Sequence, residues 1–535
     1  MKKVTIPYQE LSYFSGLMAG YLNEHDDVQG LYNRFPNLVN FKQQLLEKQT
    51  SWSDASAKRL VLKNALLKQY AGVTDNNASL LNVESLAHST TFTITTGHQL
   101  NLFTGPLYFL YKIISTINLC KQLGTAYPNY AFVPVYWMAT EDHDFEEIQH
   151  FNFKGRKVVF EKESTSAVGN LGTSGLENVQ EVINQLWPDS VYGEELKNLF
   201  GKAYLEHDTL ATATRFLAHA LFKDEGLVII DGDDASLKTI VAPYFKEELI
   251  NQTSFKEVSK TLANWPAAYN VQVNPREINL FYLTAAYRKR IIAVNDGFEI
   301  DETDLRFTQK ELLTELENHP ERFSPNVLLR PLYQEVILPN LCYIGGGGEL
   351  AYWLELKRYF NKVKVVFPML LLRNSALLVT HKQAEKILNL SCSLRDLFLR
   401  EHELSTVVTN NVTAIPIDFT VQREQLHKQF ASLYELASQT DKSFLGAVAA
   451  QEKKQINGLD ALEKRLLKAQ KIKCSGHIDR AAALQQALFP GGSLQERKEN
   501  FAVFYLDHGK ELLEIIKSNL DPLDPTFTVI TLPDL

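Results

Sequence analysis

An acidic cluster is the first part of this sequence whose residue types could carry chemistry. Residues 140–147 read Thr-Glu-Asp-His-Asp-Phe-Glu-Glu, which places five carboxylates and one imidazole within seven residues. Mutual repulsion makes such a cluster costly unless something positive binds there, such as a substrate ammonium, a metal ion or nearby arginines. The simpler alternative is an acidic loop in which Glu146 and Glu147 begin a helix.

This acidic cluster supplies most of the candidate catalytic residues. Glu141 or Asp144 could act as a general base that deprotonates an attacking amine. Asp142, His143 and Asp144 could instead hold a divalent metal, although adjacent loop residues rarely all point inward. The catalytic candidates, with one histidine from the segment described next, are His98, Glu141, Asp142, His143 and Asp144.

A turn between two glycines is the second candidate. It runs from Gly97 to Gly105, and Pro106 then suits the first turn of a helix. Backbone N–H groups before a helix can face an anion, and His98, Gln99 and Thr104 add side-chain donors. The alternative is an ordinary strand-to-helix turn with a capping threonine. The chain has neither a Walker A motif nor GxGxxG.

Arginines and a run of glycines form the third candidate. Arg330, placed by the pattern at a strand or loop end, and Arg373, at the end of an apolar run, suit a carboxylate or phosphate. Gly345–Gly348 permits close backbone approach, whereas Glu349 after it favours a cationic group. The candidate substrate-binding residues are Gly97, Gln99, Thr104, Gly105, Arg330, Gln334, Glu349, Tyr352 and Arg373.

Five apolar runs predict the strands that position these residues. They are Thr91–Thr96, Ala131–Ala139, Leu227–Ile230, Leu341–Ile344 and Val363–Leu372. Continuous apolar runs are typical of strands covered on both faces, and an expected helix over Pro106–Leu123 gives a strand–helix–strand unit. A second helix is expected from Glu349 to about Phe360. We therefore predict an α/β protein with a Rossmann-like, mostly parallel sheet, which binds ligands outside the carboxyl ends of its strands.

Other segments predict insertions and a helical domain. A hairpin is expected around Lys154-Gly155, and Thr308 with Glu311 has the spacing of a capping box. Residues 420–488 lack proline and repeat apolar residues every three or four positions, which favours two long helices in an antiparallel coiled coil. The expected division is 1–150, 226–240 and 326–385 as core, 151–225 and 241–325 as connecting insertions, 386–490 as the coiled-coil domain, and 491–535 returning to the core.

Composition restricts the class of protein. The 535 residues carry a formal net charge of −8, which argues against nucleic acid as the main partner. The four cysteines lie far apart, which fits a reducing compartment, and the chain starts without the apolar segment of a signal peptide. No apolar run approaches the length needed to cross a bilayer. We expect a cytoplasmic protein without a membrane partner.

Three long segments resemble one enzyme family. They are TGHQLNLFTGPLYFLYK, PVYWMATEDHDFEE and FSPNVLLRPLYQEVILPNLCYIGGGGELAYWLEL, with support from FPMLLLRNSALL. The chain is similar here to the cysteine-adding enzymes of bacillithiol biosynthesis, the BshC family. The resemblance implies a Rossmann-like core with connecting-peptide insertions, a long helical coiled coil and a homodimer. It also implies ligation of the carboxyl group of cysteine to the amine of glucosaminyl-malate.

The resemblance suggests roles for the candidates. The cysteine carboxyl would be activated near residues 97–105, the 141–144 cluster would orient the amine and take its proton, and Arg330 or Arg373 would hold the malyl carboxylates. Related nucleotidyl-transferring enzymes carry an HxGH motif where this chain has Phe103-Thr104-Gly105-Pro106, so use of ATP stays open and no metal is assigned. The alternatives are a metal-dependent hydrolase built on Asp142, His143 and Asp144, and a non-catalytic coiled-coil scaffold.

Overall fold

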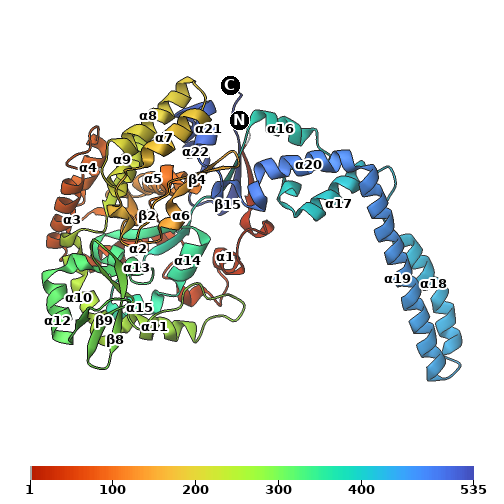
Figure 1. Cartoon of the computed structure of the whole chain (residues 1–535). Helices are drawn as coiled ribbons and strands as arrows, with labels where there is room; N and C mark the ends of the chain where they lie inside the picture. The colour runs from red at the N-terminus through yellow and green to blue at the C-terminus, as the bar shows by residue number, and fades with distance from the viewer. Residues whose placement is uncertain (1–2, 535) are drawn as a thin grey trace. The chain divides into compact units, whose positions relative to one another are not determined.

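The computed structural model describes residues 3–534, which form two compact units. The first unit runs to Leu378 and resumes from Ser493 to Ile530. The second comprises Val379–Gly492 and Thr531–Asp534. Figure 1 labels many of the elements of both.

A five-stranded parallel sheet forms the centre of the first unit. Its strands are β2 (Thr91–His98), β3 (Ala131–Met138), β6 (Val228–Asp231), β12 (Asn340–Gly345) and β13 (Met369–Leu372). Their order is β13-β12-β2-β3-β6, and every neighbouring pair is parallel. The predicted Rossmann-like class is therefore confirmed. Because the chain extends the sheet first to one side of β2 and then to the other, the switch point for ligands lies between β2 and β12.

Helices bury the sheet, which explains its apolar strands. All residues of β2 and β12 are buried. Helix α5 (Tyr108–Ala126) connects β2 to β3, and α2 (Leu38–Ser51) contributes Phe41 and Leu45 to the same core. Other helices of this unit are α1 (Gly16–Leu22), α3 (Ser56–Gln69), α4 (Asn77–Ser85), α6 (Phe145–Ile148), α21 (Ala502–His508) and α22 (Glu511–Asn519).

The second half of the core differs from the expected elements. Arg330 does not end a strand or loop: it begins helix α13 (Arg330–Ile337), because Pro331 suits the first turn and the Asn326 side chain accepts hydrogen bonds from the N–H groups of residues 328 and 329. The helix expected from Glu349 to Phe360 is two helices, α14 (Gly347–Leu354) and α15 (Lys357–Val363).

The expected strand Val363–Leu372 was also too long. Lys364 adopts a left-handed conformation with φ of 59° at the end of α15, and only Met369–Leu372 joins the sheet. An apolar run alone does not distinguish a buried strand from the buried end of a helix.

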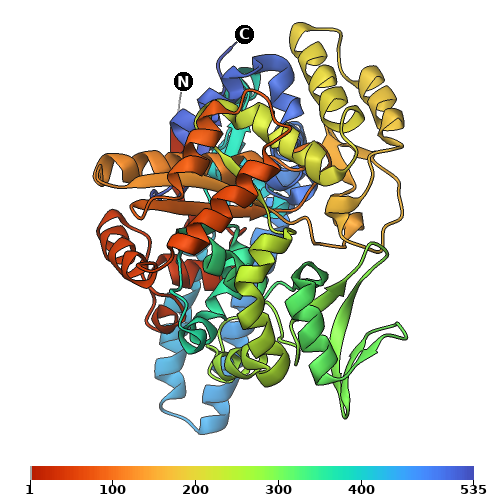
Figure 2. The same cartoon turned by 90° about the vertical axis from the view of Figure 1, so that its left-hand side faces the viewer.

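Two insertions follow β3 and β6. The first contains the predicted hairpin, β4 (His150–Phe153) and β5 (Arg156–Val159), with φ of 48° at Lys154 and 79° at Gly155, and helices α7 (Leu176–Leu186), α8 (Val191–Leu205) and α9 (Leu210–Phe222). The second contains α10 (Ala235–Asn251), α11 (Thr253–Leu262) and α12 (Gln309–Asn318), which begins at the predicted capping box of Thr308 and Glu311. Its antiparallel strands, green in Figure 2, are β7 (Leu280–Leu283), β8 (Arg288–Val294), β9 (Gly297–Ile300), β10 (Arg306–Phe307) and β11 (Phe323–Pro325).

The C-terminal segment adds a strand to a small sheet. Strand β15 (Thr526–Thr531) lies between β1 (Lys3–Pro7), to which it is antiparallel, and β14 (Ala376–Val379). Within residues 3–534, no helix is both long and apolar enough to cross a membrane.

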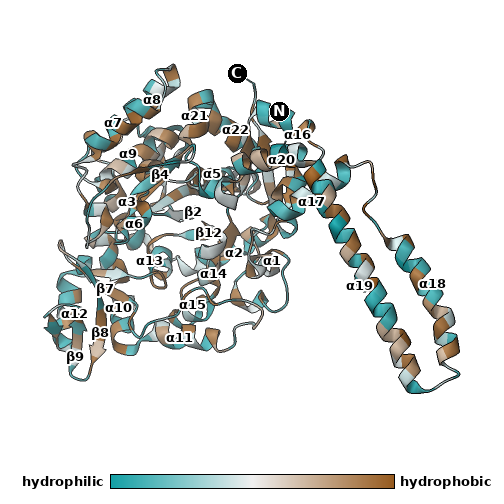
Figure 3. Ribbon diagram, turned by 45° about the vertical axis from the view of Figure 1, so that its right-hand side comes forward, coloured by the Kyte–Doolittle hydropathy of each residue, from teal (hydrophilic) through white to brown (hydrophobic). Residues whose placement is uncertain are grey.

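The second unit is helical. Its helices are α16 (His381–Leu388), α17 (Glu401–Val412), α18 (Thr420–Ala437), α19 (Lys442–Lys473) and α20 (Ser475–Leu488). Helices α18 and α19 form the coiled-coil hairpin, with Phe430, Ala437 and Val448 buried between them. Figure 3 shows polar and apolar residues alternating along both. Residues 420–488 thus form three helices and not two, because the backbone leaves the helical conformation at Cys474 and α20 packs against α17.

Candidate active site

A cavity of about 1100 Å³ opens at the carboxyl ends of β2, β3 and β12, where β7 and β8 of the second insertion form part of its wall. It therefore lies at the switch point of the sheet. Most residues proposed from the sequence meet here, namely Gly97, His98, Gln99, Glu141, Asp142, His143, Arg330, Glu349, Tyr352 and Arg373. Four do not line it: Thr104, Gly105, Asp144 and Gln334.

A buried lysine that was not among the candidates stands in this cavity. Lys112, on α5, donates a hydrogen bond from Nζ to the Gly97 carbonyl at 2.7 Å and lies 2.6 Å from a carboxylate oxygen of Glu349. Burial lowers the pKa of Lys112, against the opposing effect of Glu349. An ammonium group has three donors, so one remains for a ligand.

Glu349 is fixed by further contacts. The Tyr343 hydroxyl donates to one oxygen at 2.8 Å, and the Gly346 N–H donates to the other at the start of α14. Burial alone would raise the pKa of Glu349, but the adjacent Lys112 ammonium lowers it below its ordinary value. Glu349 therefore stays charged and holds Lys112, instead of serving as a free acid.

Two arginines stand on the same side as Lys112. Arg330 lies over the rings of Trp137 and Tyr343, and its buried Nη2 has no hydrogen-bond partner among the described residues. Arg373 lies over Tyr108 and donates from Nη2 to Glu496 at 2.7 Å, whereas its buried Nε has no partner within residues 3–534. Unpaired buried donors are costly, so both arginines are suited to a bound anion.

His98 lies beside these cations. Burial, together with the charges of Lys112 and Arg373, holds the pKa of His98 well below its ordinary value, so the ring is neutral at pH 7. The ring is hydrogen-bonded to the backbone of Thr104, and Nε2 is buried without a partner in the part of the chain that the structure describes. His98 can therefore offer a ligand a neutral hydrogen-bonding group.

Carboxylates occupy a different part of the cavity wall. Glu141 lies in this part of the wall. Both Glu141 and Asp233, which does not line the cavity, place an oxygen 2.7 Å from Nζ of Lys238, whose side chain has no exposed surface. Burial alone would lower the pKa of Lys238, but its two carboxylate partners raise it. Burial raises the pKa of Glu141, which makes it a stronger base than a solvated carboxylate.

Asp142 and His143 complete the acidic side. Gln99 donates to Asp142 at 2.9 Å and also to Glu147, so this amide crosslinks the end of β2 to the loop after β3. Arg288 lies 3.0 Å from Nδ1 of His143 and donates to it, because a guanidinium has no acceptor. Burial, with Arg288 as the next cause, lowers the pKa of His143, so its ring is neutral.

The four candidates outside the cavity have other positions. The Thr104 and Gly105 turn is held by Asn500, which donates to the carbonyls of Phe103 at 2.7 Å and Gly105 at 2.6 Å. Gly105 has φ of 63°, and a Cβ there would lie 2.7 Å from that of Asn101. These residues shape the turn and do not face the cavity.

Asp144 and Gln334 also point elsewhere. Asp144 is exposed and precedes the short helix α6 without a side-chain cap. Gln334 is completely buried beneath the cavity, where Arg330 donates to it at 3.2 Å. The structure therefore places Asp144 away from the site and Gln334 behind one of its arginines.

Two family models match consecutive parts of the chain. Residues 1–374 match the family model for the N-terminal Rossmann-like domain of bacillithiol biosynthesis BshC, and residues 376–532 match the model for its C-terminal coiled-coil domain. The chain belongs to the BshC family. This confirms the resemblance inferred from the sequence and connects the chain to bacillithiol biosynthesis. Family membership does not favour a metal-dependent hydrolase or a non-catalytic scaffold.

Curated BshC relatives match over nearly the whole chain. A protein of Flavobacterium johnsoniae is 54% identical, over 98% of this chain and 99% of the relative. One from Christiangramia forsetii is 51% identical over 98% of both, and one from Cytophaga hutchinsonii is 36% identical over 97% and 96%. Each carries the name "Putative cysteine ligase BshC".

Several groups of the BshC site were missed because they are single charges on apolar helices. Lys112 lies in Tyr108–Ala126, and Lys238 in Ala235–Asn251. A lysine on a buried helix face requires a carboxylate partner, which was the available signal. The cavity is also lined by four arginines outside the candidate set, Arg276, Arg288, Arg290 and Arg497. In the sequence, Arg288 and Arg290 could be anion contacts but are more commonly explained as exposed charges on a strand.

The candidate metal set of Asp142, His143 and Asp144 is not assembled in this member of the BshC family. His143 and Asp144 are exposed, and Nδ1 of His143 is occupied by Arg288. Over residues 3–534, no group of three or more His, Cys, Asp and Glu side chains is placed to hold a metal ion.

Proposed function

We propose that this chain ligates the carboxyl group of cysteine to the amine of glucosaminyl-malate. One observation carries the proposal: the cavity has Lys112, Arg330 and Arg373 in one part of its wall and Glu141 and Asp142 in another. Such a cavity is complementary to a substrate with carboxylates and an amine. The names of the curated relatives, which specify cysteine ligation, support the same reaction class.

The geometry suggests a role for each of these residues in the reaction. Arg330 and Arg373 bind the malyl carboxylates with their unpaired donors. Glu141 takes a proton from the attacking amine, since burial raises its pKa toward the range of a useful base. Lys112 and His98 face the charge that develops on the activated carboxyl. His143 has its lone pair engaged by Arg288 and serves to orient the acidic loop.

The activating donor is the second part of the proposal. Amide formation from a free carboxylate is uphill in water, so the acid must be activated before the amine attacks. We propose ATP as the co-substrate that supplies this activation, with no metal assigned from protein ligands. The 97–105 turn keeps the glycine of the HxGH motif but lacks its histidines. The neutral ring of His98 and the ammonium group of Lys112 would therefore make the contacts to the activated group.

Reconstitution tests both parts. Purified protein is incubated with glucosaminyl-malate, cysteine and ATP, and the thiol product is followed together with AMP and ADP. AMP indicates adenylation and ADP an acyl phosphate. Glu141→Gln is the matched loss-of-base variant, and Glu146→Gln, an exposed position in the adjoining helix α6, is its control. No thiol product from the wild-type protein contradicts the proposal, and product formed without ATP contradicts its second part.

We also propose a cytoplasmic homodimer assembled through the α18–α19 hairpin. Large apolar side chains remain exposed on these helices, namely Val421, Leu433, Leu436, Phe444, Leu445, Leu462 and Ile472. The free cysteines of the chain fit a reducing compartment. Light scattering of the full chain and of Leu436→Asp and Leu462→Asp variants tests the dimer, which is contradicted by a wild-type monomer at micromolar concentration.

A further inference from the structure

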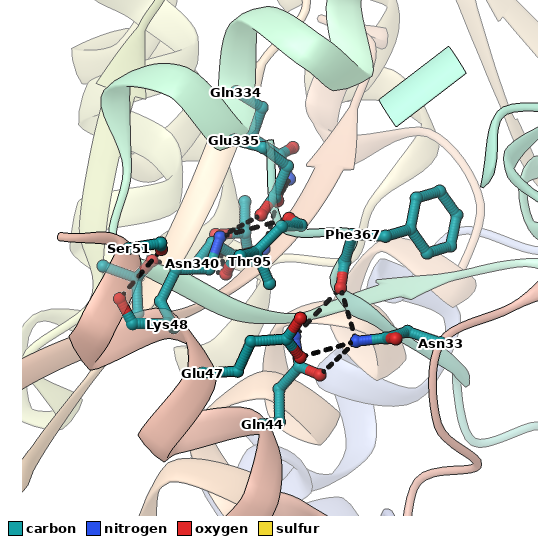
Figure 4. A network of polar contacts seen from close by, with 12 residues as sticks. Asn33, Gln44, Glu47, Lys48, Ser51, Thr95, Gln334, Glu335, Asn340 and Phe367 are labelled. Carbon is teal, nitrogen blue, oxygen red and sulfur yellow. Dashed lines mark hydrogen bonds and ion pairs between the residues drawn. The ribbon is translucent and has the colours of Figure 1, made fainter. Parts of the chain in front are cut away.

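A buried polar network that includes Gln334 and Glu335 lies behind the cavity (Figure 4). Through Gln334 it reaches Arg330. It begins at Gln334, one helical turn after Arg330 on α13. The side-chain oxygen Oε1 of Gln334 accepts a hydrogen bond from Nη1 of Arg330 at 3.2 Å. The side-chain nitrogen Nε2 of Gln334 donates to Glu335 at 3.0 Å. Both ends of the amide are therefore engaged, which fixes its orientation.

Glu335 is anchored from two directions. Asn340 of β12 donates to one oxygen at 2.6 Å, and Lys48 of α2 lies 3.0 Å from the other. Asn340 in turn accepts from the Thr95 hydroxyl of β2 at 2.9 Å. The glutamine, the carboxylate, the lysine and Asn340 are at most 1% exposed. A connected network in a dry interior is rigid, because any displaced member leaves an unsatisfied group.

The residue type at position 334 is informative. A carboxylate there would pair with Arg330 and cancel its charge, and would also lie against the Glu335 carboxylate. An apolar side chain would leave Nη1 of Arg330 without this acceptor. A neutral amide orients the guanidinium and leaves its full charge for a ligand. Meanwhile the buried Nη2 has no partner among the described residues, and Arg330 lines the cavity.

We propose that Gln334 is a positioning residue: held by the Glu335, Lys48 and Asn340 anchor, it orients Arg330 to bind the anionic part of the substrate. This inference rests on the proposed function for the identity of that substrate. Gln334 itself does not line the cavity and contacts no reacting atom. The sheet, α2 and α13 are thereby coupled to one binding group.

Gln334→Met tests this role, because it removes the amide and nearly keeps the volume. We expect the KM for glucosaminyl-malate to rise about tenfold, which corresponds to a charge-assisted hydrogen bond that loses its alignment, while kcat and the KM for cysteine change less than twofold. Gln44→Met is the matched control. Gln44 is equally buried in the same region but bonds to the Phe367 carbonyl and not to Arg330.

A double variant distinguishes a positioning role of Gln334 from a general loss of stability. If Gln334 acts through Arg330, Gln334→Met adds nothing to the KM of Arg330→Lys. Additive effects overturn the inference, and so does an equal rise of KM in Gln44→Met. If Gln334→Met does not fold, Gln334→Glu keeps the volume, and a KM within twofold of wild type in that variant also overturns it.

Binding of malate alone keeps this test separate from the proposed function. Calorimetry on the wild type, Gln334→Met and Gln44→Met requires no turnover. A wild type that binds malate but makes no product contradicts the proposed function, whereas weaker binding only in Gln334→Met supports the positioning role. A wild type that does not bind malate overturns the inference.

Discussion

Replacing Lys238 by methionine removes the ammonium group held between Glu141 and Asp233. Its Nζ lies 2.7 Å from an oxygen of each, and the lysine side chain is fully buried. The two carboxylates are themselves only 11% and 17% exposed. Methionine keeps the length of the side chain, so packing is largely preserved and the change is mainly electrostatic.

The size of the effect follows from this burial. Removing one partner of a buried ion pair costs about 3–5 kcal/mol, and the slight exposure of the carboxylates places Lys238→Met near the lower value. The compact unit that contains the pair spans roughly 400 residues. With about 2.1 cal/mol/K per residue, its unfolding entropy is about 0.85 kcal/mol/K, so the apparent Tm is expected to fall by about 3–4 °C.

Two further variants define the outcome by scanning calorimetry. Glu141→Gln in the Lys238→Met background removes one of the two uncompensated carboxylates and should recover about half of the loss. Lys246→Met is the control on the same helix, because its pair with Glu317 is exposed and should shift Tm by less than about 1 °C. Equal losses in Lys238→Met and Lys246→Met refute the reasoning, as does a double variant less stable than Lys238→Met.

The loss should also depend on pH. Burial already raises the pKa of Glu141 above its ordinary value of 4.5, and without Lys238 it rises further. A carboxyl whose folded pKa is raised binds its proton more tightly in the folded state, so it destabilises the fold increasingly as pH climbs above 4.5. The deficit of Lys238→Met is therefore expected to be smaller near about pH 5.5 than near about pH 8. A deficit that grows on acidification contradicts this sign.

Three other predictions follow from the site. Lys112→Met is expected to lower kcat about 10²–10³-fold, as for loss of a donor to developing charge; a kcat within twofold of wild type in saturating assays excludes that role. Asp144→Asn should keep activity within about twofold while Asp142→Asn loses about tenfold or more in kcat/KM, and the reverse order would show that the exposed residue is the functional one. Gly105→Ala, at φ of 63° and against Asn101, should cost about 1–3 kcal/mol by thermal unfolding, and an unchanged Tm would contradict the strain.

The sequence predicted which segments meet at the site better than which side chains face it. Gly97, Glu141 and Arg373 follow or end parallel strands, and such ends share one edge of a sheet, so their proximity follows from the strand pattern. The direction in which each side chain points does not follow from the strand pattern. Asp144 is three residues from Glu141 yet is exposed, because it stands at the start of α6, whose buried side chains are Phe145 and Ile148.

Contacts between residues far apart in the sequence determine the side-chain positions that the strand pattern does not predict. The Thr104–Gly105 turn is held by Asn500, nearly 400 residues further along the chain, and Arg330 is oriented by a helix that the residue itself begins. Gln334 became a candidate as part of the segment that resembles the BshC family, but that resemblance did not distinguish a residue in the cavity from one behind it. Local patterns do not encode such contacts, which depend on the assembled sheet.

The three lysines that the structure buries within residues 3–534 have a common arrangement around this cavity. Lys48 pairs with Glu335, Lys112 with Glu349 and Lys238 with Glu141, at 3.0, 2.6 and 2.7 Å. Buried ion pairs contribute little net stability compared with apolar side chains of the same volume, because both charges lose their hydration. Three such pairs around one cavity therefore indicate a requirement other than stability. Each fixes a charged group that either lines the cavity or belongs to the network that reaches Arg330, and fixed charges stabilise a reaction without reorganising when it occurs.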